Sequence, residues 1–227
     1  MSGKVFWLAG MFLALSSLMQ AAPGDEETIQ VKEFTNLNVG DSFVNVTNDG
    51  STITFAALDI TTVMATGNIC VNVYTFDPAE ELVSCCSCML TPNALQSLSV
   101  RNDLISNTLT PATPSSVVVK LLSTAPLVNY NTGAQSCNPG RPEGAVITGY
   151  LTLNLFNNSL HAWGTTLHAL STSPGTYHTT ETPFSRGELG AEEFTNITRY
   201  CAFIQASGSG FGICKSCRTG GLGAARQ

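Results

Sequence analysis

Residues 69–89 read ICVNVYTFDPAEELVSCCSCM and carry the pattern that decides the fold. Valines alternate with Cys70 and Tyr74, as in a β-strand whose successive side chains point to opposite faces. An Asp-Pro turn signal follows, and residues 82–89 can run back beside the first strand. We therefore predict a β-hairpin in which Cys70 and the cluster from Cys85 to Cys88 face each other across the two strands.

Outward from this hairpin, most of the chain is rich in Val, Ile, Thr, Phe and Tyr, which favour strands. An Asn-Asp-Gly turn signal predicts a second hairpin between 42–46 and 52–57. The apolar run 117–122 predicts a buried strand. Alternation over 145–156 is the longest strand signal, and 160–170 is its expected return partner.

Helical spacing is present at two places. Leucines and an isoleucine within 95–105 predict a short helix. Apolar residues also recur at helical spacing between 194 and 204, after Ser185 and Glu188 in capping-box spacing. We predict a helix over 189–206, ended by glycines. The expected fold is mainly β, a sandwich-like or partly open antiparallel sheet with one C-terminal helix packed on it and disulfides to stabilise it.

The first 21 residues have the layout of a secretory signal. A single cation, Lys4, precedes the apolar run 5–19, and Ala21 and Ala22 supply small residues for cleavage. The alternative is a membrane anchor, but this run is shorter than the roughly 20 residues that span a bilayer. We predict a signal over 1–21 and a single secreted β-rich domain over 22–227, located in the medium, at the cell surface or in the periplasm.

The cysteines are even in number, which in an exported chain indicates a disulfide framework. They are Cys70, Cys85, Cys86, Cys88, Cys137, Cys201, Cys214 and Cys217. Eight cysteines allow 105 pairings, so the sequence leaves the connectivity open. Adjacent residues on a strand point in opposite directions, so Cys85 and Cys86 are expected to have partners on opposite sides. Cys137 is expected to pin a long polar loop over 124–144, and Cys201 to tie the helix to the tail or the sheet.

The C-x-x-C pair at Cys214 and Cys217 has two alternative interpretations, a redox pair and part of a zinc site. A redox pair is expected after a strand and at the start of a helix, whereas a glycine-rich turn precedes this one. A zinc site needs a second such pair or nearby histidines, and His161, His168 and His178 lack ligand spacing. We favour structural disulfides, with no metal and no cofactor.

Charge and composition exclude several classes of protein. Only 11% of residues are charged, with 16 acidic against 10 basic side chains, which disfavours nucleic-acid binding. Threonine (27), serine (21) and asparagine (16) supply most of the polarity. No run after the signal is apolar and long enough to span a membrane. No catalytic motif is found. The glycine–serine stretch 207–210 partly matches the nucleophile elbow of hydrolases but is typical of a helix end. Carboxylates that are adjacent in the sequence point in different directions, so they do not suit a shared role in glycoside hydrolysis.

We therefore expect a non-enzymatic secreted or cell-surface protein with a structural or binding role. The alternatives are a secreted hydrolase or carbohydrate-binding protein whose site is built from loops, and a self-assembling surface subunit that uses exposed strand edges. A sugar-binding aromatic platform would depend on Trp163, and a lone tryptophan near a strand is more often part of the core.

Two cysteine-containing patches resemble other sequences. Residues 83–88 with 91–93, and the end of the chain from 201 to 223, are similar to parts of uncharacterised secreted bacterial proteins. This resemblance implies export from a bacterium. It implies no activity, cofactor, partner or site residue.

Overall fold

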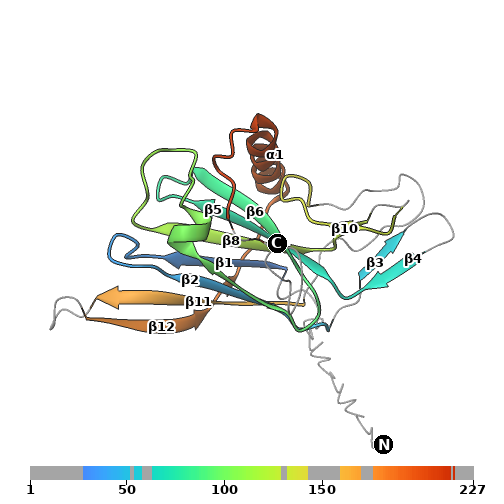
Figure 1. Cartoon of the computed structure of the whole chain (residues 1–227), viewed down its shortest axis with the longest axis horizontal. Coiled ribbons are helices and arrows are strands. Elements are labelled where there is room, and N and C mark those ends of the chain that lie inside the picture. Colours follow the sequence, from blue (N-terminus) through green and yellow to red (C-terminus); the bar gives the residue numbers. More distant parts are fainter. Residues whose placement is uncertain are drawn as a thin grey trace, which may run out of the picture.

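The computed structural model describes residues 28–51, 54–57, 63–128, 132–142, 159–169, 176–215 and 217. These residues form two larger antiparallel sheets, two short hairpins and a C-terminal α-helix (Figure 1). The prediction of a mainly β fold with one C-terminal helix is confirmed. The predicted signal over 1–21 and the predicted strand over 145–156 lie outside the described residues.

The first sheet contains the hairpin predicted from residues 69–89. Its strand order is β13 (Ser185–Arg186), β1 (Ile29–Phe34), β8 (Val117–Thr124), β5 (Ile69–Phe76) and β6 (Leu82–Leu90). The β5–β6 register places Cys70 opposite Met89 and Tyr74 opposite Cys85. Strand β8, predicted from its apolar run, lies between β1 and β5, so both of its edges are paired.

The second sheet has the order β12 (Tyr177–Pro183), β11 (Leu160–Ala169), β2 (Phe43–Asn48) and β7 (Leu95–Ser99). The predicted strand 160–170 is confirmed as β11, which pairs with β2 and β12.

The predicted hairpin between 42–46 and 52–57 is wrong. Strand β2 pairs with β11 and β7, while β3 (Thr54–Ala57) pairs with β4 (Val63–Thr66). Asn48 explains the difference, because its side-chain amide donates to the carbonyl oxygens of Gly67 (2.7 Å) and Leu90 (3.0 Å). The turn residue is therefore tied to other segments instead of closing a hairpin.

The helix predicted within 95–105 is also largely wrong. Leu98 is buried between the sheets while Leu95 is 60% exposed, so these leucines lie on opposite faces of a strand. A single π-helical turn follows (Val100–Leu104), and the Ser99 hydroxyl accepts a hydrogen bond from the Asn102 amide at its start (2.8 Å).

The C-terminal helix is α1 (Ala191–Ser207), close to its predicted bounds. The predicted capping box is wrong, because Ser185 belongs to β13 and Gly190 is the residue that precedes the helix. Glu192 and Glu193 lie in the first turn, where the negative carboxylates interact favourably with the positive end of the helix dipole. Gly208 ends the helix with φ +61°, a left-handed conformation that glycine adopts without strain.

The predicted long loop over 124–144 contains a short hairpin, β9 (Leu127–Val128) with β10 (Gln135–Ser136). It leads to Cys137 and then to Pro139, whose carbonyl oxygen accepts a hydrogen bond from the buried Tyr74 hydroxyl (2.7 Å). This segment therefore covers part of the outer face of the first sheet.

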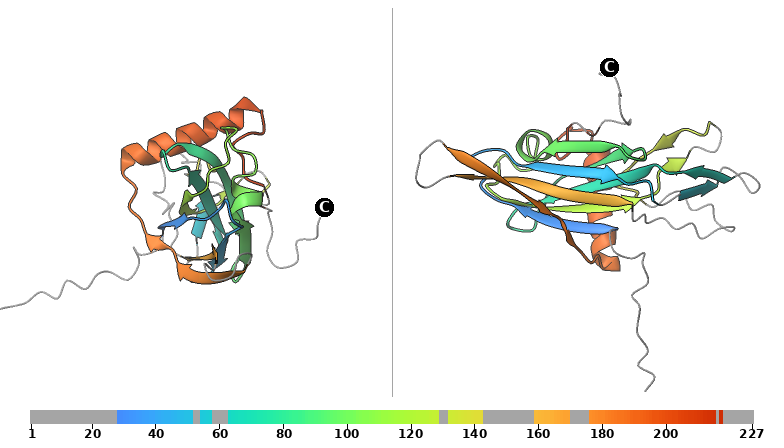
Figure 2. Two further views of the ribbon diagram at one scale, coloured as in Figure 1. Left: turned by 90° about the vertical axis from the view of Figure 1, so that its left-hand side faces the viewer. Right: turned by 90° about the horizontal axis from the view of Figure 1, so that it is seen from below.

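The layers are the second sheet, the first sheet and the helix, in that order (Figure 2). One apolar cluster fills the space between the sheets and includes Phe34, Val73 and Leu121. A second cluster joins the first sheet to α1 and includes Tyr74 and Ile204. Strand β5 contributes to both clusters, because seven of its eight residues are buried.

Candidate functional site

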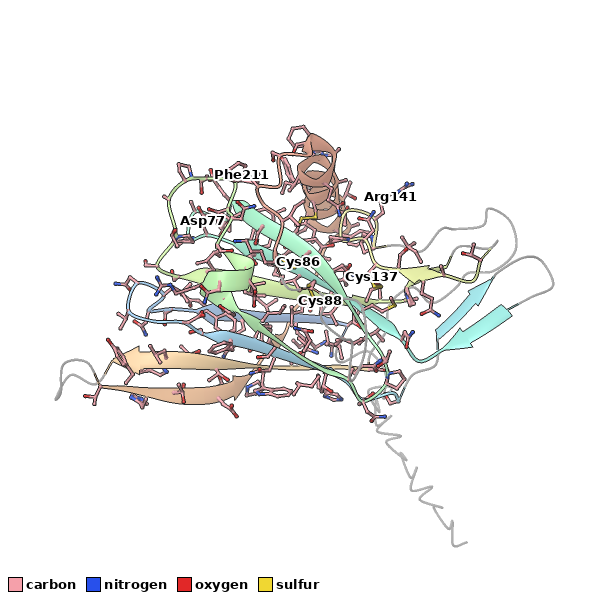
Figure 3. The ribbon with its side chains drawn as sticks, in the orientation of Figure 1. Asp77, Cys86, Cys88, Cys137, Arg141 and Phe211 are labelled. Atoms are coloured by element: carbon pink, nitrogen blue, oxygen red, sulfur yellow. A yellow bond between two sulfur atoms is a disulfide. The ribbon has the colours of Figure 1, made fainter. Side chains whose placement is uncertain are left out.

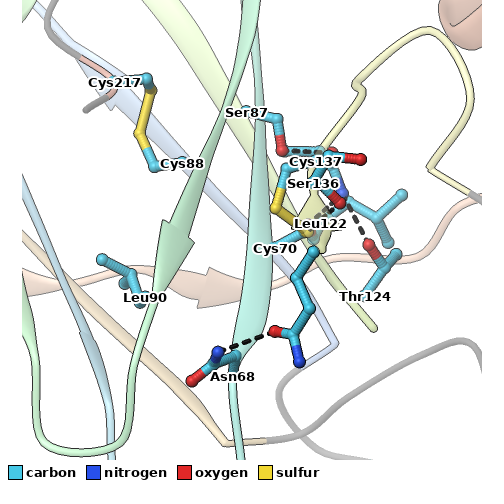
Figure 4. The surroundings of a disulfide bond; sticks show 12 residues. Asn68, Cys70, Ser87, Cys88, Leu90, Leu122, Thr124, Ser136, Cys137 and Cys217 are labelled. Carbon is cyan, nitrogen blue, oxygen red and sulfur yellow. Dashed lines mark hydrogen bonds between the residues drawn. A yellow bond between two sulfur atoms is a disulfide. The ribbon is translucent and has the colours of Figure 1, made fainter. Parts of the chain in front are cut away.

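All eight cysteines are paired in four disulfides, as expected for a disulfide framework. Cys70 bonds to Cys137 across 67 residues and pins the segment after β10 to the first sheet (Figure 4). The expectation that a disulfide pins Cys137 is confirmed. Disulfides at four places indicate an oxidising environment.

Cys85 and Cys86 have partners on opposite faces of the sheet, as the alternation of a strand predicts. Cys85 bonds to Cys201 of α1, and both belong to the cluster between the helix and the first sheet. Cys86 bonds to Cys214 and belongs to the cluster between the two sheets. The helix is thus tied to the sheet and not to the tail.

The two cysteines of the C-x-x-C pair are not bonded to each other. Cys214 bonds to Cys86, and Cys217 bonds to Cys88, so both sulfurs serve as crosslinks to β6 (Figure 3 labels Cys86 and Cys88). The tail also lies beside the free edge of β6, where the Cys85 amide donates to the Gly212 carbonyl oxygen (2.9 Å). The edge of the first sheet is therefore covered by the chain itself.

A groove opens beside α1, where the helix meets the turn between β5 and β6 and the segment after the π-helical turn. Its volume is about 860 Å³. The lining residues are mostly apolar or aromatic: Phe76, Glu80, Glu81, Leu82, Val83, Leu109, Thr110, Asn196, Ile197, Arg199, Tyr200, Phe203 and Ile204.

The helix supplies one wall of the groove. Ile197 and Ile204 are buried against the first sheet, whereas Tyr200 and Phe203 are 54% and 71% exposed. An exposed aromatic pair three residues apart lies on one side of the helix, away from the fully buried Cys201. These rings extend the apolar surface of the groove from the core to solvent.

Hydrogen bonds hold the other two walls in place. In the β5–β6 turn, an Asp77 carboxylate oxygen accepts from the amides of Ala79 and Glu81, each at 2.9 Å. On the far side, the Asn107 carbonyl oxygen accepts from the Gly212 amide (2.7 Å), which holds the segment carrying Leu109 against the tail. The groove is thus bordered by anchored backbone.

Charges lie only at the rim. Arg199 is exposed, donates to the Asn196 side-chain oxygen (3.3 Å) and has its guanidinium carbon 5.5 Å from the Tyr200 ring centroid. Glu80 and Glu81 are exposed on the opposing turn. The lining contains no histidine, cysteine or serine, so it lacks the usual nucleophile and base of acyl transfer.

The histidines lie on the second sheet. His168 of β11 stacks on its cross-strand neighbour His178 of β12, with ring centroids 5.0 Å apart. His161 bonds to the Asp49 carboxylate (2.8 Å). Burial raises the pKa of Asp49, but hydrogen bonds from Ser51 and His161 lower it more strongly, so the net pKa is below its usual value.

Trp163 lies on the outer face of the second sheet and not in the core. Along β11, Leu160 and Ala162 point inward and are buried, so Trp163 and Thr165 point outward. Side-chain hydrogen bonds cross this face: Ser97 donates to Asn45 (2.6 Å), and Asn45 donates to Thr165 (3.1 Å). The prediction that Trp163 is part of the core is therefore wrong.

Sequence reasoning missed the groove. Its walls come from β5, β6, the segment around Leu109 and α1, which are far apart in the chain. The available signal was the aromatic pair Tyr200 and Phe203, which falls outside the helical positions assigned to the core. Two exposed aromatics on one side of a helix form an apolar area at the protein surface.

Within the part of the chain that the structure describes, no helix combines the length and apolar content needed to cross a membrane. Among the same residues, no three His, Cys, Asp or Glu side chains gather as ligands for a metal ion. Comparison with known proteins gives no match: no family model fits the chain, and no curated protein or solved structure is significantly similar to it.

Proposed function

We propose that the chain is an exported binding protein that holds a small, largely apolar molecule in the groove beside α1. Export is supported by the predicted signal over 1–21 and by four disulfides, which persist in oxidising compartments. The observation that carries the binding role is the groove itself, a preformed apolar surface between anchored walls.

The size and lining of the groove define the class of ligand. A volume of about 860 Å³ lies within the range of small-molecule sites, which are concave and mostly apolar with a few polar groups. Tyr200 and Phe203 offer exposed aromatic side chains to a flat or aliphatic body. Arg199 at one rim and the two glutamates at the other can fix a polar end group. The ligand is therefore an amphiphile with an apolar body.

A pair of phenylalanine variants tests this function. Phe203 lines the groove, whereas Phe211 is similarly exposed (55%) but lies outside the lining. We expect the neutral fluorescent amphiphile N-phenyl-1-naphthylamine to bind saturably to the parent protein and to F211E. Affinity should fall at least about tenfold in F203E, because a carboxylate would replace an apolar contact. Equal affinity in F203E and F211E would disprove the groove as the binding site.

A second candidate function is carbohydrate binding on the outer face of the second sheet, favoured by the outward position of Trp163. The tryptophan is flanked in register by Asn45 of β2 and Pro183 of β12, next to the hydrogen-bonded hydroxyls and amides described above. Aromatic rings beside such groups suit sugar rings. Binding on a glycan array that W163A abolishes and F203E retains would support this role, and an array without signal would exclude it.

A further inference from the structure

Four sulfur atoms gather where the tail meets β6. Cys86 is bonded to Cys214, and Cys88 is bonded to Cys217. In addition, the sulfur of Cys217 lies 3.3 Å from the sulfur of Cys86, to which it is not bonded. Cys217 therefore contacts the sulfurs of both disulfides. Among the described residues, no such second contact is found at Cys70–Cys137 or Cys85–Cys201.

We propose that Cys86, Cys88, Cys214 and Cys217 form a disulfide-exchange site whose substrate is a small dithiol. The dithiol reduces the Cys88–Cys217 disulfide, which accepts two electrons. The disulfide that still joins β6 to the tail then changes from Cys86–Cys214 to Cys86–Cys217. This chemistry is separate from the groove and from the proposed ligand.

Exposure decides where the dithiol reacts first. Of the four cysteines, Cys217 is the partly exposed one, whereas Cys86, Cys88 and Cys214 are buried. Thiol–disulfide exchange requires access to the sulfur that is attacked. The thiolate of the dithiol therefore attacks Cys217, and Cys88 leaves as a thiolate. The second thiol of the reagent then releases Cys217 as a thiolate and forms the oxidised, cyclic reagent.

The short contact permits a second step. The Cys217 thiolate attacks the sulfur of Cys86, a Cys86–Cys217 bond forms, and Cys214 leaves as a thiolate that takes a proton from water. The two electrons given up by the dithiol now reside on Cys88 and Cys214, which take up two protons from water, while the dithiol has released its two protons to water. One disulfide still joins β6 to the tail, so the first reduction leaves the tail covalently attached.

A double variant tests the central contact directly. C88S/C214S retains only Cys86 and Cys217 of the four, and C88S/C217S retains the native pair Cys86 and Cys214 as the control for folding. We expect Cys86 and Cys217 to form a disulfide in the first variant, with no alkylation of either under denaturing conditions without reductant. Two alkylated thiols, in a variant with the circular dichroism spectrum of the control, would overturn the proposal.

The parent protein provides a second test that does not depend on the folding of a variant. It is treated with one equivalent of dithiothreitol, quenched in acid, alkylated and mapped by mass spectrometry. Trypsin cleaves after Lys215 and so separates Cys214 from Cys217. Exchange predicts molecules labelled at both Cys88 and Cys214. Label only at Cys88 with Cys217, or only at Cys70 with Cys137, would overturn the proposal.

Discussion

At the scale of single residues, two hydroxyls in the first sheet are buried without a hydrogen-bond partner among the described residues. They belong to Thr75 of β5 and Ser123 of β8. An unsatisfied buried polar group costs about 1–3 kcal/mol. These two unpaired hydroxyls therefore reduce the free energy of unfolding.

Replacing Thr75 with valine removes the unpaired hydroxyl and keeps the shape of the side chain. We expect T75V to raise the free energy of unfolding by about 1 kcal/mol, measured by urea denaturation. The matched control is T124V, since the Thr124 hydroxyl accepts a hydrogen bond from Asn72 (3.0 Å) and its loss should destabilise. The interpretation fails if both variants are destabilised alike.

Tyr74 couples stability to alkaline pH. Burial raises the pKa of its hydroxyl above the usual value near 10, and the hydroxyl donates to the Pro139 carbonyl oxygen. The unfolded chain therefore loses this proton at lower pH than the folded chain, so the free energy of unfolding falls as pH rises above about 10.

We expect Y74F to lose this part of the alkaline destabilisation while costing about 1 kcal/mol at neutral pH through the missing hydrogen bond. Guanidinium denaturation at a series of pH values, compared with the exposed control Y177F, measures both effects. A Y74F protein with the same alkaline slope as the parent would contradict the role of Tyr74.

At the scale of elements, the attachment of α1 depends on the Cys85–Cys201 bond. The helix also packs Ile197 and Ile204 on the sheet, and Glu193 pairs with Lys120 of β8. The disulfide closes a loop of more than a hundred residues, for which stabilisation of about 2–5 kcal/mol is typical.

We expect C85S/C201S to unfold at lower denaturant concentration and to lose hydrogen-exchange protection chiefly in α1. C70S/C137S is the control, because it removes a disulfide on the same face and leaves the helix attached. Equal loss of α1 protection in both variants would show that the helix does not depend on its own crosslink.

The elements that sequence predicts well are those whose signal is local. The β5–β6 hairpin and α1 follow from alternation and helical spacing within about twenty residues. Strands β2 and β7 could not be placed in this way, since their partners are set by burial of Val44, Val46 and Leu98 between sheets. Tertiary packing overrode the turn signal after β2 and the leucine spacing in β7.

The candidate sites were less predictable than the fold. The sequence indicates that all cysteines are crosslinked and that Cys85 and Cys86 diverge, but their partners lie more than a hundred residues away. The groove likewise depends on Leu109 and Phe203 meeting through the tertiary structure. Pairings and cavities of this kind depend on the arrangement of distant elements.

At the scale of the whole molecule, β6 is the point to which other parts are tied. Three of the four disulfides begin on this strand, one to the helix and two to the tail. The fourth bond joins its neighbour β5 to the segment after β10. The described layers, helix, first sheet and second sheet, are therefore stabilised by sulfur crosslinks in addition to two apolar clusters.

The intact mass of the protein, taken under denaturing conditions with and without reductant, is the most direct test of this crosslinked architecture. The four disulfides predict a mass eight hydrogens below that of the reduced chain and no cysteine open to alkylation before reduction. An unreduced protein that already has the mass of the reduced chain, with all its thiols alkylated, would contradict it.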